Sequence, residues 1–410
     1  MATACCSTAP VSSGPPGHVS LVLDEHRRYL ADRPRVEAFR AALRATVRPG
    51  DIVLDLACGT GVLGFLALDA GARHVYAVDE GPIIDTARRI ARANGYGERT
   101  TFIRELSTRV ALPERVDVVV CDQIGHLGIE AGAFEYLLDA RRVMKPEGRT
   151  IPAAVTFMAA PVESPELRKR LMFWTSRPAN LDVASALEIA LNTGYPRFVD
   201  VDELLADPGT LATRSLPPSL PGPIRGEIVC RIARPGVLDG VCAWFDAELA
   251  PGVRMTNAPG HPDRIDRRQV LLPIERPVRV EPGDSVTIQV SMLPPTLVSW
   301  RVTIEACDRS ADRCGTFSHS TFRGMLMSTE DLVRTNPDSS PALTPAGIAR
   351  RTVLELCDGH RSLRSVQDEV YARHSDLFPT RNDAAAFVAE VVTRYSIAHA
   401  ALSNRESGDR

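Results

Sequence analysis

The run Val-Leu-Asp-Leu-Ala-Cys-Gly-Thr-Gly at residues 53–61 constrains this chain more than any other feature, because Asp79 follows it by eighteen residues. The order predicts an apolar strand, a glycine turn, a helix and a second strand that ends on an acid. Glycines let a backbone approach a ligand closely, and an acid at the end of the second strand can bind both hydroxyls of a ribose. The pattern therefore predicts a nucleoside site in a βαβ unit.

We interpret the turn at Gly59 and Gly61 as a nucleoside site without a pyrophosphate. This favours S-adenosylmethionine (SAM) over NAD as the cofactor. The alternative is an ordinary βαβ unit with a tight turn and no ligand.

Composition limits the remaining classes of protein. The chain has 410 residues, enough for two or three domains, and 44% of them are apolar. A net charge of −3 gives no general attraction to nucleic acid or to an anionic membrane, and no apolar run is long enough to span a bilayer. The N-terminus lacks a basic start and an apolar stretch, so we expect a cytoplasmic protein rather than a secreted one. Nine cysteines without metal-ligand spacing predict no metal site.

The pattern of apolar residues changes along the chain, which predicts separate domains. After a disordered lead at 1–19, strands and helices alternate over 20–150, which indicates an α/β Rossmann-like domain. Residues 151–328 alternate with period two, which predicts an antiparallel barrel or sandwich, interrupted by helical segments at about 164–215. A polar linker at 329–342 precedes three short helices at 343–402.

Residues 26–39 add a family resemblance. The pattern His26-x-x-Tyr29-Leu30-x-Asp32-x-x-Arg35-x-x-x-Phe39 resembles the helix that precedes the first SAM motif in the protein arginine methyltransferases. The glycine turn, residues 70–75 and Ile151-Pro152 also resemble that family. The resemblance implies a Rossmann-like SAM domain, a β-barrel domain and a helical arm that forms a head-to-tail homodimer.

The same resemblance implies a cofactor role for nine residues. Arg35 would hold the SAM carboxylate, which a guanidinium binds in bidentate fashion. Asp55 and the glycine turn would line the methionine group, and Asp79 would bind the ribose. Thr108 stands where the family has a glutamate that contacts adenine. The candidate cofactor-binding residues are His26, Arg35, Asp55, Cys58, Gly59, Gly61, Asp79, Glu80 and Thr108.

The acceptor loop departs from the family. Arginine methyltransferases hold the substrate guanidinium between two glutamates after the fourth strand; here Asp122 takes the first place, and Glu130 takes the second if the loop is one residue shorter. The family's Thr-His-Trp motif falls at residues 265–267, where all three residues differ. We hypothesise that Asp122 and Glu130 frame the acceptor, with His126 and Asp266 as their catalytic partners. The alternative is that Asp122 caps the next element and His126 faces solvent.

Residues 343–397 resemble the small winged-helix domain of PqqD-type peptide chaperones, which dock leader peptides. This resemblance implies a peptide substrate with a separate recognition segment. The alternative is a helical cap that packs on the barrel or on a dimer partner.

Together these features predict a SAM-dependent methyltransferase that modifies a nitrogen, or another nucleophile, of a peptide in natural-product biosynthesis. A free arginine or an arginine-like metabolite is an alternative acceptor, and host proteins are another. A non-catalytic SAM-binding scaffold is a rival of a different class. We expect no nucleic-acid substrate, because the chain lacks a basic patch and an Asn-Pro-Pro-Tyr type of motif.

Overall fold

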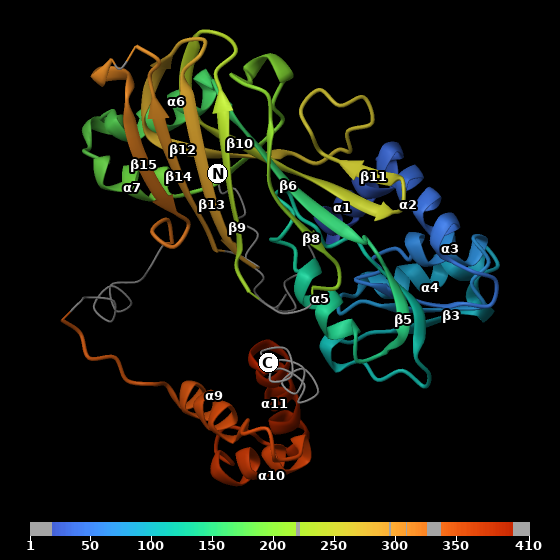
Figure 1. Ribbon diagram of the computed structural model, residues 1–410. Helices are drawn as coiled ribbons and strands as arrows, with labels where there is room; N and C mark the ends of the chain where they lie inside the picture. Colours follow the sequence, from blue (N-terminus) through green and yellow to red (C-terminus); the bar gives the residue numbers. More distant parts are fainter. Residues whose placement is uncertain (1–18, 219–221, 295–296, 309, 326–337, 397–410) are drawn as a thin grey trace, which may run out of the picture.

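The computed structural model of the chain divides into a parallel α/β domain, an antiparallel β domain and a small helical unit (Figure 1). It describes residues 19–218, 222–294, 297–308, 310–325 and 338–396. Residues 1–18 of the predicted lead at 1–19, and most of the predicted linker, therefore lie outside the described residues. Within those ranges, no helix has the length and apolar character needed to cross a membrane.

The first domain is a five-stranded parallel sheet with the order β3-β2-β1-β4-β5. Its strands are β1 (Ile52–Leu56), β2 (His74–Val78), β3 (Thr100–Ile103), β4 (Val116–Cys121) and β5 (Met144–Ile151). Its helices are α1 (Val19–Ala31), α2 (Arg33–Thr46), α3 (Val62–Asp69), α4 (Ile83–Ala93) and α5 (Ala133–Ala140). Every residue of β1 is buried, as expected for a parallel strand covered on both faces. The predicted Rossmann-like fold is confirmed.

The register of the central strands brings the candidate site together. Leu56 pairs with Val78 of β2 and with Cys121 of β4. The residues that follow these three positions therefore leave the sheet at the same edge, which is where open α/β sheets bind ligands.

The second domain consists of two antiparallel sheets. One has the order β7-β12-β10-β6-β8, with β11 paired to β10, and the other has the order β15-β14-β13-β9. The strands are β6 (Ala154–Val162), β7 (Tyr195–Arg197), β8 (Gly209–Ser215), β9 (Ile224–Arg231), β10 (Gly236–Ala250), β11 (Val253–Thr256), β12 (Gln269–Val280), β13 (Ser285–Leu293), β14 (Leu297–Glu305) and β15 (Gly315–Ser320). Both sheets contribute to one apolar core. Among the described residues no ladder joins the two sheets, so the pairing does not form the closed barrel that the resemblance implied.

A helical insertion separates β6 from β8. It contains α6 (Pro165–Met172) and α7 (Leu187–Leu191), joined by short 3-10 turns. The insertion is shorter than the predicted 164–215, because β7 and β8 return to the sheet through pairing with β12 and β6.

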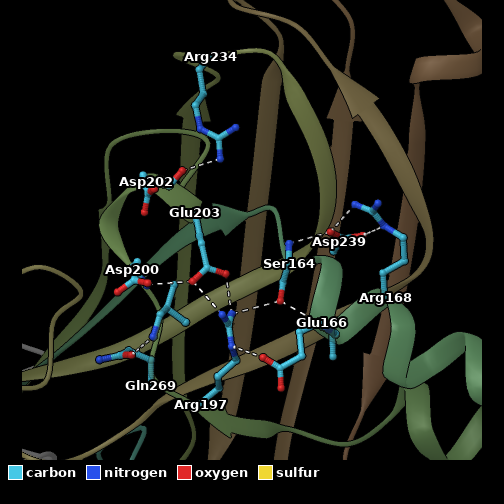
Figure 2. A network of polar contacts seen from close by, with 12 residues as sticks. Ser164, Glu166, Arg168, Arg197, Asp200, Asp202, Glu203, Arg234, Asp239 and Gln269 are labelled. Atoms are coloured by element: carbon cyan, nitrogen blue, oxygen red, sulfur yellow. Dashed lines mark hydrogen bonds and ion pairs between the residues drawn. The ribbon is translucent and has the colours of Figure 1, made fainter.

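Partly buried ion pairs hold the base of this insertion on the sheet (Figure 2). Asp239 of β10 accepts two hydrogen bonds of 2.7 Å from the Arg168 guanidinium and one from the Ser164 N–H. Arg197 of β7 forms a bidentate pair with Glu203 at 2.6 and 2.9 Å. Bidentate geometry restricts orientation, so the insertion leaves the sheet in a defined direction.

The C-terminal unit contains three helices with an apolar core of their own. They are α9 (Pro345–Leu356), α10 (Leu363–Arg373) and α11 (Arg381–Tyr395). Residues 338–396 contain no strand, so the predicted helices are present, but a winged-helix fold is not confirmed.

Candidate functional site

The glycine turn after β1 has a backbone that requires glycine. Gly59 has φ 54° and Gly61 has φ 82°, both left-handed. A Cβ on Gly59 would lie 2.8 Å from Cε1 of His26, whose ring covers the turn from α1. Gly61 is also the N-cap of α3, so the first N–H groups of that helix point into the turn.

Asp79 is attached to the same turn. Its Oδ2 accepts a hydrogen bond of 2.9 Å from the Gly59 N–H, and its Oδ1 accepts one of 2.8 Å from the Gly81 N–H. Each carboxylate oxygen can accept a second bond, so the acid is held in place with capacity left for two hydroxyl groups. The neighbouring Glu80 is exposed.

Asp55 lies beneath the turn and lacks a full set of partners. Its Oδ2 accepts a hydrogen bond of 2.8 Å from the Gly64 N–H, whereas Oδ1 is buried without any partner. Burial raises the pKa of Asp55 to about 7. A buried carboxylate oxygen without a partner is unfavourable, and a cationic group of a ligand would satisfy it. The ammonium group of SAM has this character, so the residues present fit SAM.

Arg35 connects the cofactor edge with the acceptor loop. Its side chain is 7% exposed, and Nε donates a 2.5 Å hydrogen bond to Oδ2 of Asp122. Nη1 donates to the Tyr29 carbonyl at 3.2 Å, and the guanidinium lies over the rings of Tyr29 and Phe39. Asp32 caps the start of α2 by accepting from the Arg35 N–H. These contacts place a fixed guanidinium beside the carboxyl ends of β1 and β4.

The remaining candidate cofactor-binding residues make few contacts with the glycine turn. Cys58 is buried, and its N–H donates to the Val78 carbonyl at 2.9 Å. Because burial raises the pKa of its thiol, Cys58 is neutral and supports the turn through its backbone. Thr108 is exposed in the 3-10 turn Ser107–Arg109. Within the described residues, neither Thr108 nor the Glu80 side chain makes a polar contact with the glycine turn.

Glu130 organises the acceptor loop through backbone contacts. One of its oxygens accepts from the N–H groups of His126 and Leu127 at 2.7 and 2.8 Å, and the other accepts from Ile129 at 3.1 Å. Gly125 makes this fold possible, because a Cβ there would lie 2.6 Å from Cδ of Glu130. Three backbone N–H groups therefore already occupy hydrogen-bonding sites of this carboxylate.

Asp122 lies between two arginines, with 8% of its side chain exposed. Besides its bond to Arg35, its Oδ2 lies 3.5 Å from Nη2 of Arg267, whose side chain is 10% exposed. Oδ1 of Asp122 and Nη1 of Arg267 are both buried without hydrogen-bond partners. Arg267 is a site residue that the sequence analysis missed. The sequence did contain a signal for this residue: position 267, which matches the third residue of the family's Thr-His-Trp motif, is a cation.

His126 and Asp266 lie further from this pair. Nδ1 of His126 is 3.2 Å from the Arg268 carbonyl, and burial lowers the pKa of the imidazole. The Asp266 side chain is about half exposed, with Arg28 at 4.0 Å, while its backbone N–H donates to Asp32 at 2.8 Å. Asp266 therefore joins the loop to α2 at the rim, and it is Arg267 that contacts Asp122.

Asn257 joins the acceptor loop to the β domain. Its fully buried amide donates to the carbonyls of His126 and Arg268 at 2.8 and 2.9 Å, and its oxygen accepts from the Phe245 N–H. This contact is a second site feature that the sequence analysis missed, because a single asparagine has no spacing that predicts its partners.

Comparison with known proteins agrees with this geometry. Residues 53–148 match the family model described as a methyltransferase domain. Human protein arginine N-methyltransferase 2 is 28% identical over 280 residues, which cover 64% of this chain and 64% of that protein, just under two thirds of its length. An arginine N(omega)-methyltransferase of Streptomyces achromogenes is 26% identical over 280 residues, covering 66% of this chain and 77% of that enzyme.

A solved structure shows the same fold. The Trypanosoma brucei PRMT1 enzyme–prozyme heterotetrameric complex with AdoHcy has a TM-score of 0.65 at 20% identity, covering 72% of this chain and 96% of that one. The fold, the site and the family model define residues 53–148 as a SAM-dependent methyltransferase domain. The relatives show that the chain is similar to arginine N-methyltransferases, and the methyltransferase domain implies SAM as the cofactor.

The glycine turn does not by itself exclude a pyrophosphate, so the expectation of a site without one is corrected. Gly59, Gly61 and Gly64 have the spacing of a GxGxxG motif, which dinucleotide sites also use. The glycines therefore do not distinguish SAM from NAD. The matched methyltransferase domain supports SAM.

Proposed function

We propose that the chain transfers a methyl group from SAM to a nucleophile of a peptide residue in natural-product biosynthesis. The observation that carries this proposal is Arg35, whose guanidinium lies at the cofactor edge and pairs with Asp122 of the acceptor loop at 2.5 Å. One residue thus connects the cofactor position with the acceptor position.

SAM supplies an electrophilic methyl carbon. In the proposed reaction the acceptor's lone pair forms the new bond to this carbon, the carbon–sulfur bond breaks with its electrons remaining on sulfur, and the acceptor loses a proton. Arg35 would bind the carboxylate of SAM, Asp55 its ammonium group and Asp79 its ribose. Asp122 would orient the acceptor, since alignment is the main contribution of an enzyme to such a displacement. Glu130 would stabilise the conformation of the acceptor loop.

The proposed peptide acceptor rests on the C-terminal unit. Leu343, Ile348, Leu354 and Leu363 expose apolar side chains beside or within α9 and α10. Such a surface suits the docking of a peptide segment, which would separate recognition from chemistry. The alternative acceptor, a free arginine-like metabolite, is supported by the similarity to the arginine N(omega)-methyltransferase of Streptomyces achromogenes.

The helical insertion supports a proposed homodimer. Met172, Phe173 and Leu181 are 61%, 49% and 63% exposed, and a second copy would cover them. A monomer at micromolar concentration with full activity would contradict this part of the proposal.

The test is incubation of the purified chain and producer-cell extract with methyl-labelled SAM, followed by size separation of the label. Label in a peptide fraction that is lost on deletion of residues 343–410 would support the proposed peptide acceptor. Label in small molecules that is insensitive to the deletion would favour a free metabolite. Saturable SAM binding without any transfer would favour a scaffold and contradict the proposal.

A further inference from the structure

We propose that Arg267 selects the acceptor, which carries a carboxylate close to an uncharged nitrogen or oxygen nucleophile. This inference rests on the proposed methyl transfer and specifies its substrate class. The observation behind it is that the Arg267 guanidinium lies beside Asp122.

Arg267 occupies the place that a cationic acceptor would need. Its Nη2 lies 3.5 Å from Oδ2 of Asp122, and the same oxygen accepts from Arg35 at 2.5 Å. The negative charge of Asp122 is thus matched by guanidinium groups of the chain itself. Glu130, the other acid of the loop, is engaged by three backbone N–H groups. A substrate guanidinium would meet a second cation here and not a free pair of carboxylates.

Two polar atoms in the site lack partners and are complementary to such an acceptor. Nη1 of Arg267 is a buried donor and Oδ1 of Asp122 is a buried acceptor, and neither has a hydrogen bond. A guanidinium binds a carboxylate with particular strength, and a carboxylate oxygen accepts from an N–H or O–H group. A molecule that presents a carboxylate and a neutral N–H or O–H a few bonds apart satisfies both atoms.

The backbone keeps Arg267 in this position. Its N–H donates to the Ile265 carbonyl at 2.7 Å, and the next carbonyl, of Arg268, accepts from the buried Asn257 amide. Movement of Arg267 away from Asp122 would separate a buried ion pair, which is unfavourable.

The surrounding charges favour an anion. Arg264 and Arg268 of the same loop lie over the ring of Phe198, at 4.9 and 5.9 Å. The acids around Arg267 have partners of their own: Asp32 accepts from the Asp266 N–H, and Asp266 lies beside Arg28. The loop therefore presents several guanidinium groups to an approaching substrate, which attracts carboxylates.

The test compares acceptors that differ only in a carboxylate, using methyl-labelled SAM. The probes are L-histidine with histamine, L-tyrosine with tyramine, and producer-cell extract before and after its carboxylates are amidated with a carbodiimide and methylamine. We expect at least tenfold more label in the carboxylate-bearing acceptors. Equal label in amidated and untreated extract would overturn the inference while leaving the proposed transfer intact.

Variants of Arg267 provide the second readout. We expect Arg267→Gln to raise the KM for the extract acceptor at least tenfold while the KM for SAM stays within twofold, and Arg267→Lys to restore part of the loss. Arg231→Gln, which alters an exposed guanidinium of β9 outside this loop, is the control and should stay within twofold. An unchanged acceptor KM in a folded Arg267→Gln protein would overturn the inference. No label in any acceptor, with S-adenosylhomocysteine still bound, would overturn the proposed transfer, and the inference with it.

Discussion

The cofactor edge and the acceptor edge of this site are built in different ways. The cofactor edge comes mainly from the continuous segment of residues 55–81, in which strand, turn and acid follow one another. The acceptor edge is assembled from three distant segments: α2, the loop after β4 and the loop before β12. Local backbone geometry thus defines the first edge, whereas long-range contacts between two domains define the second.

This difference makes the two edges separable by mutation. A change at the cofactor edge should reduce cofactor affinity, and a change at the acceptor edge should alter stability or acceptor use while cofactor affinity remains.

Asp79→Ala should abolish most of the cofactor affinity. The variant loses the proposed bonds to two ribose hydroxyls, each about 1.5–3 kcal/mol for a charged acceptor, and the support for Gly59 and Gly81. We expect S-adenosylhomocysteine to bind about a thousandfold more weakly, about 4 kcal/mol, by isothermal titration calorimetry. Glu80→Ala, at the exposed neighbour, is the control and should stay within about twofold. An equal loss in both variants would contradict the role of Asp79.

Asn257→Ala should destabilise the junction of the two domains. The change leaves the carbonyls of His126 and Arg268 and the N–H of Phe245 with fewer partners in the interior, at about 1–3 kcal/mol for each unsatisfied group. We expect the free energy of unfolding to fall by about 3 kcal/mol in urea titrations, with cofactor affinity unchanged in the folded protein.

The control for this prediction is Arg254→Ala. It removes an exposed ion pair with Asp246, which should contribute less than about 1 kcal/mol. A loss of cofactor affinity in Asn257→Ala as large as that in Asp79→Ala would show that the two edges are not separable.

Asp55 should make the free protein less stable as the pH rises. Burial raises its pKa from 3.8 to about 7 in the folded state, so between these values the native protein binds a proton that the unfolded chain releases. Stability therefore decreases as the pH rises from about 4 to about 7 and levels off above that range. The full difference corresponds to about 4 kcal/mol, and we expect about half of it because effective dielectric constants in proteins are high.

The measurement for Asp55 is urea unfolding at pH 5 and pH 7.5 for the wild type and Asp55→Asn. The difference between the two proteins isolates Asp55 from other buried acids whose pKa burial also raises, such as Asp239. Parallel pH dependence in the two proteins would show that Asp55 is not responsible.

His126→Gln should have the smallest effect. Burial lowers the pKa of this imidazole, so it is neutral near pH 7, and its Nδ1 faces the Arg268 carbonyl and not Asp122. We expect initial rates at saturating SAM to fall less than about threefold, with the pH–rate profile unchanged. A loss above tenfold together with an altered acid limb would instead assign a proton-transfer role to His126.

The cofactor edge was predicted from the sequence more completely than the acceptor edge. Residues 53–61 and Asp79 could be placed from sequence because strand, glycine turn and acid have a characteristic spacing. Asp122 and Glu130 were correctly placed on one loop, yet their partners were not predicted. The sequence suggested His126 and Asp266 as partners of Asp122 and Glu130, whereas in the structure Arg267 contacts Asp122. Adjacent residues of an irregular loop point in different directions, and no periodicity indicates which one turns inward.

The Rossmann-like topology, the glycine turn after the first strand and the change to antiparallel strands after residue 151 could all be predicted from the amino-acid sequence alone. These features depend on apolar periodicity and on the freedom of glycine at positive φ, both properties of neighbouring residues. Only the tertiary structure shows which charge faces Asp122, which backbone N–H groups occupy both oxygens of Glu130, and how Asn257 joins the domains. Burial makes the alternative side-chain arrangements differ strongly in free energy, because an unpaired charge is unfavourable only where water is excluded.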